Sequence, residues 1–251
     1  MMVEQQHWFA GQPEYENVGL ALASDTEACV GHLGKARELT KRAVDSAIRG
    51  DNKESGAIFL AIGAQQQAAY GNAIQARQIA GEALKLAPAS QGVESESALA
   101  FAMAGDTARA ESLAQDLGNR FPLDVALSTR QAGFPLELGQ IQFVMNISCL
   151  YSVYVHGEAY LAAGQGKQAA AEFQKILDHS GIVWNCWTGA LARLGVARAN
   201  ALQASTSQGA DADAARVRAL AAYKDFLNLW KDADPDIPIL KEAKGEYAKM
   251  Q

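Results

Sequence analysis

Apolar side chains recur three or four positions apart along most of the chain, which is the spacing of one face of an α-helix. Ala36, Leu39 and Ala43 follow this spacing, and so do Ala76 and Ala80 further on. Valine, isoleucine and threonine nowhere alternate with polar residues in the way that β-strands require. The pattern therefore predicts an all-helical protein without a β-sheet.

Composition strengthens this prediction. Alanine, which is the best intrinsic helix former, occupies 49 of the 251 positions. Only six prolines occur, and most of them stand at the ends of apolar segments. Hydrophobic residues make up 49% of the chain, so a sizeable core can form.

One segment repeats at an interval of 34 residues. Ala76–Ala80 aligns with Ala110–Ala114, and Pro88 and Pro122 are separated by the same interval. A helix-turn-helix unit of this length, with small residues at fixed places and a closing proline, resembles the tetratricopeptide repeat. We therefore expect an α-solenoid of stacked antiparallel helix pairs, with the alanines at both ends of each segment buried between paired helices.

The unit that matches the repeat best covers residues 150–181. Gly157 and Tyr160 supply the Gly-x-x-Tyr step of its first helix, and Ala169 and Phe173 supply the Ala-x-x-x-Phe step of its second helix. A glycine lets two helices approach each other closely. We therefore expect Tyr160, Ala169 and Phe173 to fill the space between the two helices.

Gly195 and Ala222 mark a further unit, but 27 residues separate them instead of the 12 that separate Gly157 from Ala169. The surplus is polar and rich in small residues, so we expect a loop over residues 204–213. The expected organisation is a single superhelical domain, 1–251, made of a remnant helix (1–13), N-terminal repeats (14–122), an irregular connector (123–149), C-terminal repeats (150–234) and a capping helix (235–251).

Four segments resemble the C-terminal tetratricopeptide region of bacterial, especially acidobacterial, multidomain proteins: Trp8–Gly11, Ala36–Thr40, Phe101–Asp106 and Trp184–Leu191. In those proteins the repeats follow a serine/threonine kinase domain or a winged-helix transcriptional domain. The glycine-rich, His-Arg-Asp and Asp-Phe-Gly motifs of a kinase are absent from this sequence. The resemblance therefore implies the receptor or scaffold portion of a bacterial signalling protein.

No motif of a catalytic or metal site occurs, since His-Glu-x-x-His, Cys-x-x-Cys and Gly-x-Ser-x-Gly are all missing. The four histidines are scattered over separate repeats. We therefore expect no enzymatic activity, no cofactor and no metal ion.

The charge balance narrows the class of partner. The chain has 28 acidic and 22 basic side chains and a formal net charge of −6, which argues against a nucleic-acid binder. No apolar stretch approaches the roughly 18 residues of a membrane span, and the N-terminus lacks the features of a signal peptide. We expect a cytoplasmic protein, or an extracytoplasmic one if it derives from a membrane-anchored kinase relative.

Aromatic residues supply the candidate binding surface. Tyr151, Tyr154 and Glu158 belong to the first helix of the unit 150–181, and first helices line the concave groove of a helix-pair stack. Aromatic side chains in such a groove are common binding anchors. The other residues that we expect in the groove are Gln65, Leu99 and Trp187.

These groove residues predict a non-enzymatic interaction module that binds a protein or peptide. Two tyrosines beside one carboxylate suit a peptide with an apolar anchor and a basic neighbour. One alternative is that four aromatic residues simply pack into the neighbouring unit, namely Tyr151, Tyr154, Trp184 and Trp187. Another is a ligand-sensing domain that binds a small molecule through Tyr151, Tyr154 and Trp187.

Cys149 and Cys186 are expected near the starts of first helices in adjacent units. Neighbouring helix axes lie about 8–10 Å apart, whereas a disulfide requires Cα atoms within about 7 Å. We therefore expect two packed thiols rather than a disulfide.

Overall fold

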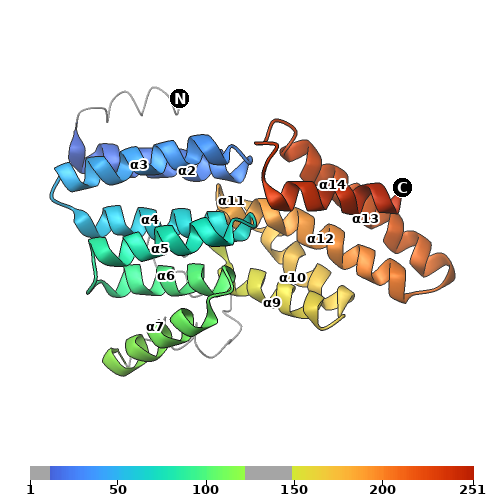
Figure 1. Ribbon diagram of the computed structural model, residues 1–251. Helices are drawn as coiled ribbons and strands as arrows, with labels where there is room; N and C mark the ends of the chain where they lie inside the picture. The colour runs from blue at the N-terminus through green and yellow to red at the C-terminus, as the bar shows by residue number, and fades with distance from the viewer. Residues whose placement is uncertain (1–11, 122–148) are drawn as a thin grey trace. The chain divides into compact units, whose positions relative to one another are not determined.

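The computed structural model describes residues 12–121 and 149–251 of the chain. Every regular element in these two ranges is a helix, which confirms the predicted all-helical class (Figure 1). Consecutive helices pack against their neighbours, as in a solenoid of helix pairs. The expected remnant helix, apart from its last two residues, and all of the expected connector except Cys149 lie outside the described residues.

Contacts divide the chain into two compact units, residues 1–131 and 132–251, where a single domain was expected from the sequence. Each unit is therefore described by itself. Within the described ranges, no helix combines the length and the apolarity that crossing a membrane requires.

The described part of the first unit, residues 12–121, consists of three helix pairs. In each pair a first helix packs against a second, and α4 also packs against α3 and α6. The pairs are α2 (Pro13–Cys29) with α3 (Leu33–Arg49), α4 (Lys53–Ala69) with α5 (Ala73–Leu86), and α6 (Gln91–Met103) with α7 (Thr107–Arg120).

The second unit continues the same pairing. Its described residues, 149–251, form α9 (Tyr151–Ala162), α10 (Gly166–Asp178), the single turn α11 (Ser180–Val183), α12 (Trp187–Thr206), α13 (Gly209–Leu229) and α14 (Pro238–Met250). The second helix α10 packs against both α9 and α12, and α14 packs against α13. The expected capping helix, 235–251, thus coincides with a helix in the structure.

Short turns connect the two helices of each pair, and a glycine makes the turn possible. Gly31, Gly71 and Gly105 have φ of 84°, 93° and 75°, and Gly164 takes the equivalent place in the second unit with a φ of 73°. Residues other than glycine rarely adopt this left-handed backbone conformation. The turns therefore fix where each first helix ends.

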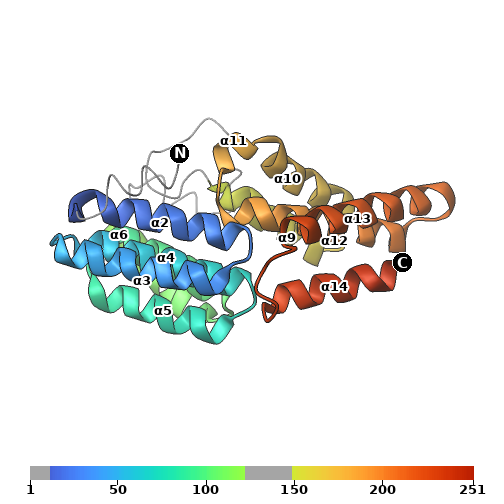
Figure 2. The same cartoon turned by 90° about the horizontal axis from the view of Figure 1, so that it is seen from above.

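The expected loop over residues 204–213 is wrong. Helix α12 continues to Thr206 and α13 begins at Gly209, so that two residues connect a long antiparallel pair (Figures 1 and 2). The segment contains three alanines, whose helix propensity outweighs its polarity. The surplus residues therefore lengthen both helices instead of forming a loop.

Phe173 of α10 is the centre of the core of the second unit. Its ring lies between two glycines: a Cβ added to Gly157 of α9 would come within 2.7 Å of the ring, and one added to Gly195 of α12 within 2.6 Å. No side chain larger than hydrogen fits at either position without a shift. This confirms the expected close approach at Gly157 and shows that α12 approaches the same ring.

The alanine prediction holds with one exception. Ala76, Ala80, Ala110 and Ala169, like Phe173, are buried. Ala114 is only half-buried, because α7 packs mainly against α6 among the described helices and Ala114 is turned partly away from that contact.

Candidate functional site

Four aromatic rings of the second unit form a connected cluster between α9, α10 and α12. The rings of Tyr151 and Trp187 stack with their centroids 5.5 Å apart, and Tyr154 meets Trp187 edge-on at 5.1 Å and Phe173 at 5.5 Å. Trp187 is only 4% exposed, whereas both tyrosines are half-buried. The alternative of packing into the neighbouring helix pair therefore applies fully to Trp187 and in part to Tyr151 and Tyr154. It is wrong for Trp184, which is 73% exposed.

Beside this cluster, charged side chains from three helices meet. Arg198 of α12 donates to both carboxylate oxygens of Glu246 on α14, at 3.0 and 2.9 Å, and to Glu242 at 3.2 Å. The hydroxyl of Tyr223 donates to the same Glu246 at 2.9 Å. These contacts attach α14 to α12 and α13, the two helices that precede it in the chain.

Glu158 of α9 adds a third carboxylate to this group. The Tyr154 hydroxyl hydrogen-bonds to it, and the charge of Arg198 acts on it from α12. We name the surface formed by Tyr154, Glu158, Arg198, Glu242 and Glu246 the acidic face. It carries three carboxylates and a single guanidinium, and Glu158 and Glu242 are exposed on it.

The surroundings shift the pKa values of the groups on this face. Burial raises the pKa of Tyr154 well above its usual range, and the neighbouring Glu158 carboxylate raises it further. Loss of hydration also raises the pKa of Glu158, opposed by the hydrogen bond from Tyr154 and by Arg198. Burial alone would lower the pKa of Arg198, but Glu246, Glu158 and Glu242 raise it. Tyr154 therefore stays neutral and Arg198 stays charged.

The two remaining expected groove residues lie in the first unit, whereas the acidic face belongs to the second. Gln65 is fully buried and donates to the backbone oxygen of Glu96 at 3.0 Å and to its carboxylate at 2.6 Å. Leu99 is half-buried. Gln65 therefore joins α4 to α6 and is not exposed to a partner.

The expectation of two thiols is wrong, because Cys149 and Cys186 form a disulfide with a Cα–Cα distance of 5.5 Å. Cys149 lies in the turn that precedes α9, and Cys186 is the N-cap residue of α12. Neither belongs to the body of a helix, so the distance between helix axes does not limit how closely they approach. The bond joins the starts of two successive first helices.

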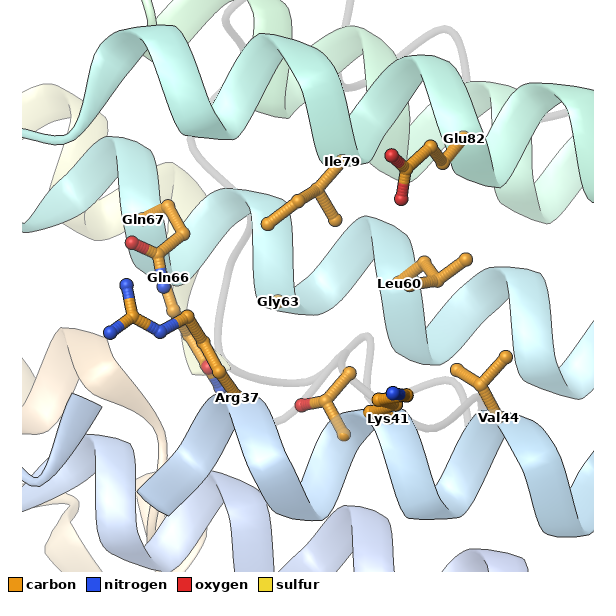
Figure 3. Close-up of a pocket in the computed structure, with 10 residues that line it drawn as sticks. Arg37, Lys41, Val44, Leu60, Gly63, Gln66, Gln67, Ile79 and Glu82 are labelled. Carbon is orange, nitrogen blue, oxygen red and sulfur yellow. The ribbon is translucent and has the colours of Figure 1, made fainter. Parts of the chain in front are cut away.

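A cleft that the sequence analysis did not predict lies in the first unit, where α3 and α5 flank α4 (Figure 3). Its volume is about 370 Å³. Residues that line it include Arg37 and Lys41 of α3, Leu60 and Gly63 of α4, and Ile79 and Glu82 of α5. Arg37 also donates to Gln75 of α5 at 3.1 Å, so it links the two walls.

The partners of Glu158 were not predicted because no local motif contains them. Glu242 and Glu246 are four residues apart on one helix face, which is a usable signal for a charged surface. Nothing in the sequence indicates that Arg198 lies opposite them. Within the described residues, no group of three or more histidine, cysteine or carboxylate side chains is placed to hold a metal ion.

No protein-family model matches the chain, and no curated protein is detectably similar to it.

Proposed function

We propose that this chain is a non-enzymatic interaction module that binds a segment of a partner protein on its acidic face. The observation that carries the proposal is the convergence of Glu158, Glu242 and Glu246 around Arg198, the only cation among the residues that define this face. Stacked helix pairs present such surfaces on consecutive helices, where an extended segment can contact several of them.

The chemistry of the face favours a basic partner segment. Glu158 and Glu242 are exposed and can pair with lysine or arginine side chains. The half-buried ring of Tyr154 lies next to them and offers an apolar edge. The partner that fits is therefore a peptide segment with one apolar residue beside basic ones; a nucleic acid, which is an anion, does not fit.

Selection from a random-peptide display library tests this proposal directly. The oxidised full-length chain should enrich peptides rich in lysine and arginine, and the double variant Glu158→Lys/Glu242→Lys should bind them at least about tenfold more weakly. Asp211→Lys/Asp213→Lys, an equal charge change at two exposed positions of α13, is the matched control and should leave binding intact. Enrichment of non-basic peptides, or equal binding by the double variant, would refute the proposal.

A second candidate, the sensing of a small molecule, is favoured by the cleft between α3 and α5. It combines apolar side chains with Lys41 on one wall and Glu82 on the other, which suits a compact ligand that carries both charges. In a screen of amino-acid-like metabolites, a compound that binds the cleft should then raise the melting temperature of the unchanged chain but not that of the Lys41→Glu variant. The Arg42→Glu variant, which carries the same charge change at the adjacent position of α3, should keep this rise in melting temperature. A rise that persists in the Lys41→Glu variant would show that the compound does not bind in the cleft.

On the resemblance of its repeats alone, we further propose that the chain serves as the scaffold portion of a bacterial signalling protein. Identification of its coding neighbourhood, or co-purification with a kinase or a transcriptional regulator, tests this assignment. Co-purification with neither class would count against it.

A further inference from the structure

The disulfide lies at the starts of two helices that carry the aromatic residues. Cys149 precedes Tyr151 by two positions, and Cys186 immediately precedes Trp187. The rings of Tyr151 and Trp187 stack at 5.5 Å. Both cysteines are buried in the core of the second unit, with exposures of 1% and 9%. The bond therefore fixes the ends from which these two rings project.

Neither of these helix starts is stabilised by its own cap. The N-cap of α9, Leu150, has a left-handed φ of 50° and makes no side-chain cap hydrogen bond, and the N-cap of α12 is Cys186 itself, which also makes none. No acidic residue stands in the first turn of either helix. In the first unit, the side chains of Asn52, Ser90 and Asp106 cap α4, α6 and α7, whereas α2, α3 and α5 also lack a side-chain cap. An uncapped first turn frays readily.

Two other contacts hold α9, one beside the disulfide and one further along the helix. The hydroxyl of Thr188 donates to the backbone oxygen of Cys149 at 2.6 Å, close to the bond. Two turns later, Gly157 packs on the ring of Phe173 regardless of the state of the cysteines. The part of α9 that depends on the disulfide is therefore its first half, which includes Tyr151 and Tyr154.

We propose that the Cys149–Cys186 disulfide is a redox-controlled clamp on the tyrosine-bearing first half of α9. When a dithiol reductant attacks, the S–S bond breaks, each cysteine sulfur gains a proton and an electron, and the dithiol is oxidised to its own disulfide. The first half of α9 then frays, while the contact between Gly157 and Phe173 keeps the second half in place. The consequence for partner binding rests on the proposed function, because Tyr154 and Glu158 belong to this helix.

Hydrogen exchange on the full chain tests the clamp without any partner. After reduction with a dithiol, the backbone amides of residues 154–158, which donate to the carbonyl oxygens of the first half of α9, should exchange at least tenfold faster, while those of residues 159–162 and of α10 and α13 change little. Unchanged exchange at residues 154–158 would overturn the proposal. Acceleration throughout the second unit would overturn it as well, because the bond would then support the whole fold rather than one helix start.

Two variants make the test specific to this bond. Cys149→Ser/Cys186→Ser should already show fast exchange at residues 154–158 without reductant and should not respond to it. Cys29→Ser removes the third cysteine, which lies on α2, and should respond as the unchanged chain does. If reductant still accelerates exchange in the double serine variant, the Cys149–Cys186 disulfide is not the cause of the acceleration.

Binding of a display-selected basic peptide, measured in both redox states, separates this inference from the proposed function. The expected result is at least a threefold weaker affinity after reduction. Equal affinity in both states would refute redox control of binding while leaving the proposed function standing. If no basic peptide binds the oxidised chain, the proposed function fails, and with it the part of this inference that concerns binding.

Discussion

At the scale of single residues, the contact between Phe173 and its two glycines is the tightest in the described structure of the second unit. The ring of a second helix touches two successive first helices, so one side chain sets the spacing of three helices. Well-packed cores resist added volume because neighbouring atoms have little room to move. A single added methyl group at either glycine would therefore destabilise the contact between these helices.

We expect Gly195→Ala to destabilise the chain by about 1–3 kcal/mol, because the new methyl group would meet the ring of Phe173. Gly245→Ala is the matched control: it also lies inside a helix, but a Cβ there meets nothing within 4 Å. That control should raise stability by roughly 0.5–1 kcal/mol through helix propensity alone. Urea denaturation of the two variants checks the prediction, and equal effects of the same sign would contradict it.

Asp25 provides a second prediction at this scale. Burial raises its pKa to about 7, although Gln66 donates a hydrogen bond to it at 2.7 Å. The folded chain therefore binds a proton more tightly than the unfolded chain, whose group titrates near 3.8. By linkage, this residue makes stability fall as pH rises from about 4 to about 7, with no further change above that range.

Asp25→Asn keeps an oxygen that can accept the bond from Gln66 but carries no charge. It should raise the free energy of unfolding at pH 8 by an amount on the order of 2 kcal/mol and have little effect at pH 4. Denaturation curves at the two pH values check this. A stabilisation that is the same at both pH values would show that the ionisation of Asp25 is not its cause.

At the scale of helices, pairing follows from short-range sequence features, whereas helix length does not. The spacing of Gly157, Ala169 and Phe173 predicts a helix pair because each contact forms between residues close in sequence. The loop predicted for residues 204–213 was wrong because small polar residues occur both in loops and on exposed helix surfaces. Only the pairing of α12 with α13 shows that these residues lie on such a helix surface.

A proline substitution distinguishes these two structures for residues 204–213. Ala204 lies in the last turns of α12, so Ala204→Pro should cost up to about 3 kcal/mol, and Ala204→Gly about 1 kcal/mol. In a flexible loop, neither change would matter. Thermal unfolding followed by circular dichroism measures the stability of both variants. If neither substitution lowers the stability, residues 204–213 form a loop after all.

The candidate site was only partly predictable, for a reason that also belongs to this scale. Tyr154 and Glu158 are one turn apart on α9, so the sequence places them on one face. Arg198 and Glu246 come from α12 and α14, and their meeting with Glu158 depends on how three helices pack. The disulfide was missed because both cysteines lie in turns, to which the spacing of helix axes does not apply.

At the scale of the whole molecule, the excess of acidic side chains adds to the field of the acidic face. The formal charge of −6 attracts a basic segment from a distance, and the carboxylates of the acidic face hold it on arrival. Because salt screens both effects, raising it from about 50 mM to about 500 mM should weaken peptide binding roughly tenfold, mainly through slower association. Surface plasmon resonance at the two salt concentrations measures this, and salt-independent affinity would indicate apolar docking instead.

The tip of the long pair α12–α13 is a suitable position for inserting a label into the protein. Gln203 is the last residue of α12 seen to bond α10, donating to Gly166 at 3.2 Å, and residues 205–210 beyond it are exposed. The tip at Ser207 and Gln208 therefore lies past the contacts that hold the second unit together. A fluorophore or an epitope tag inserted there would report on the chain in living cells without touching the surface through which it is proposed to bind.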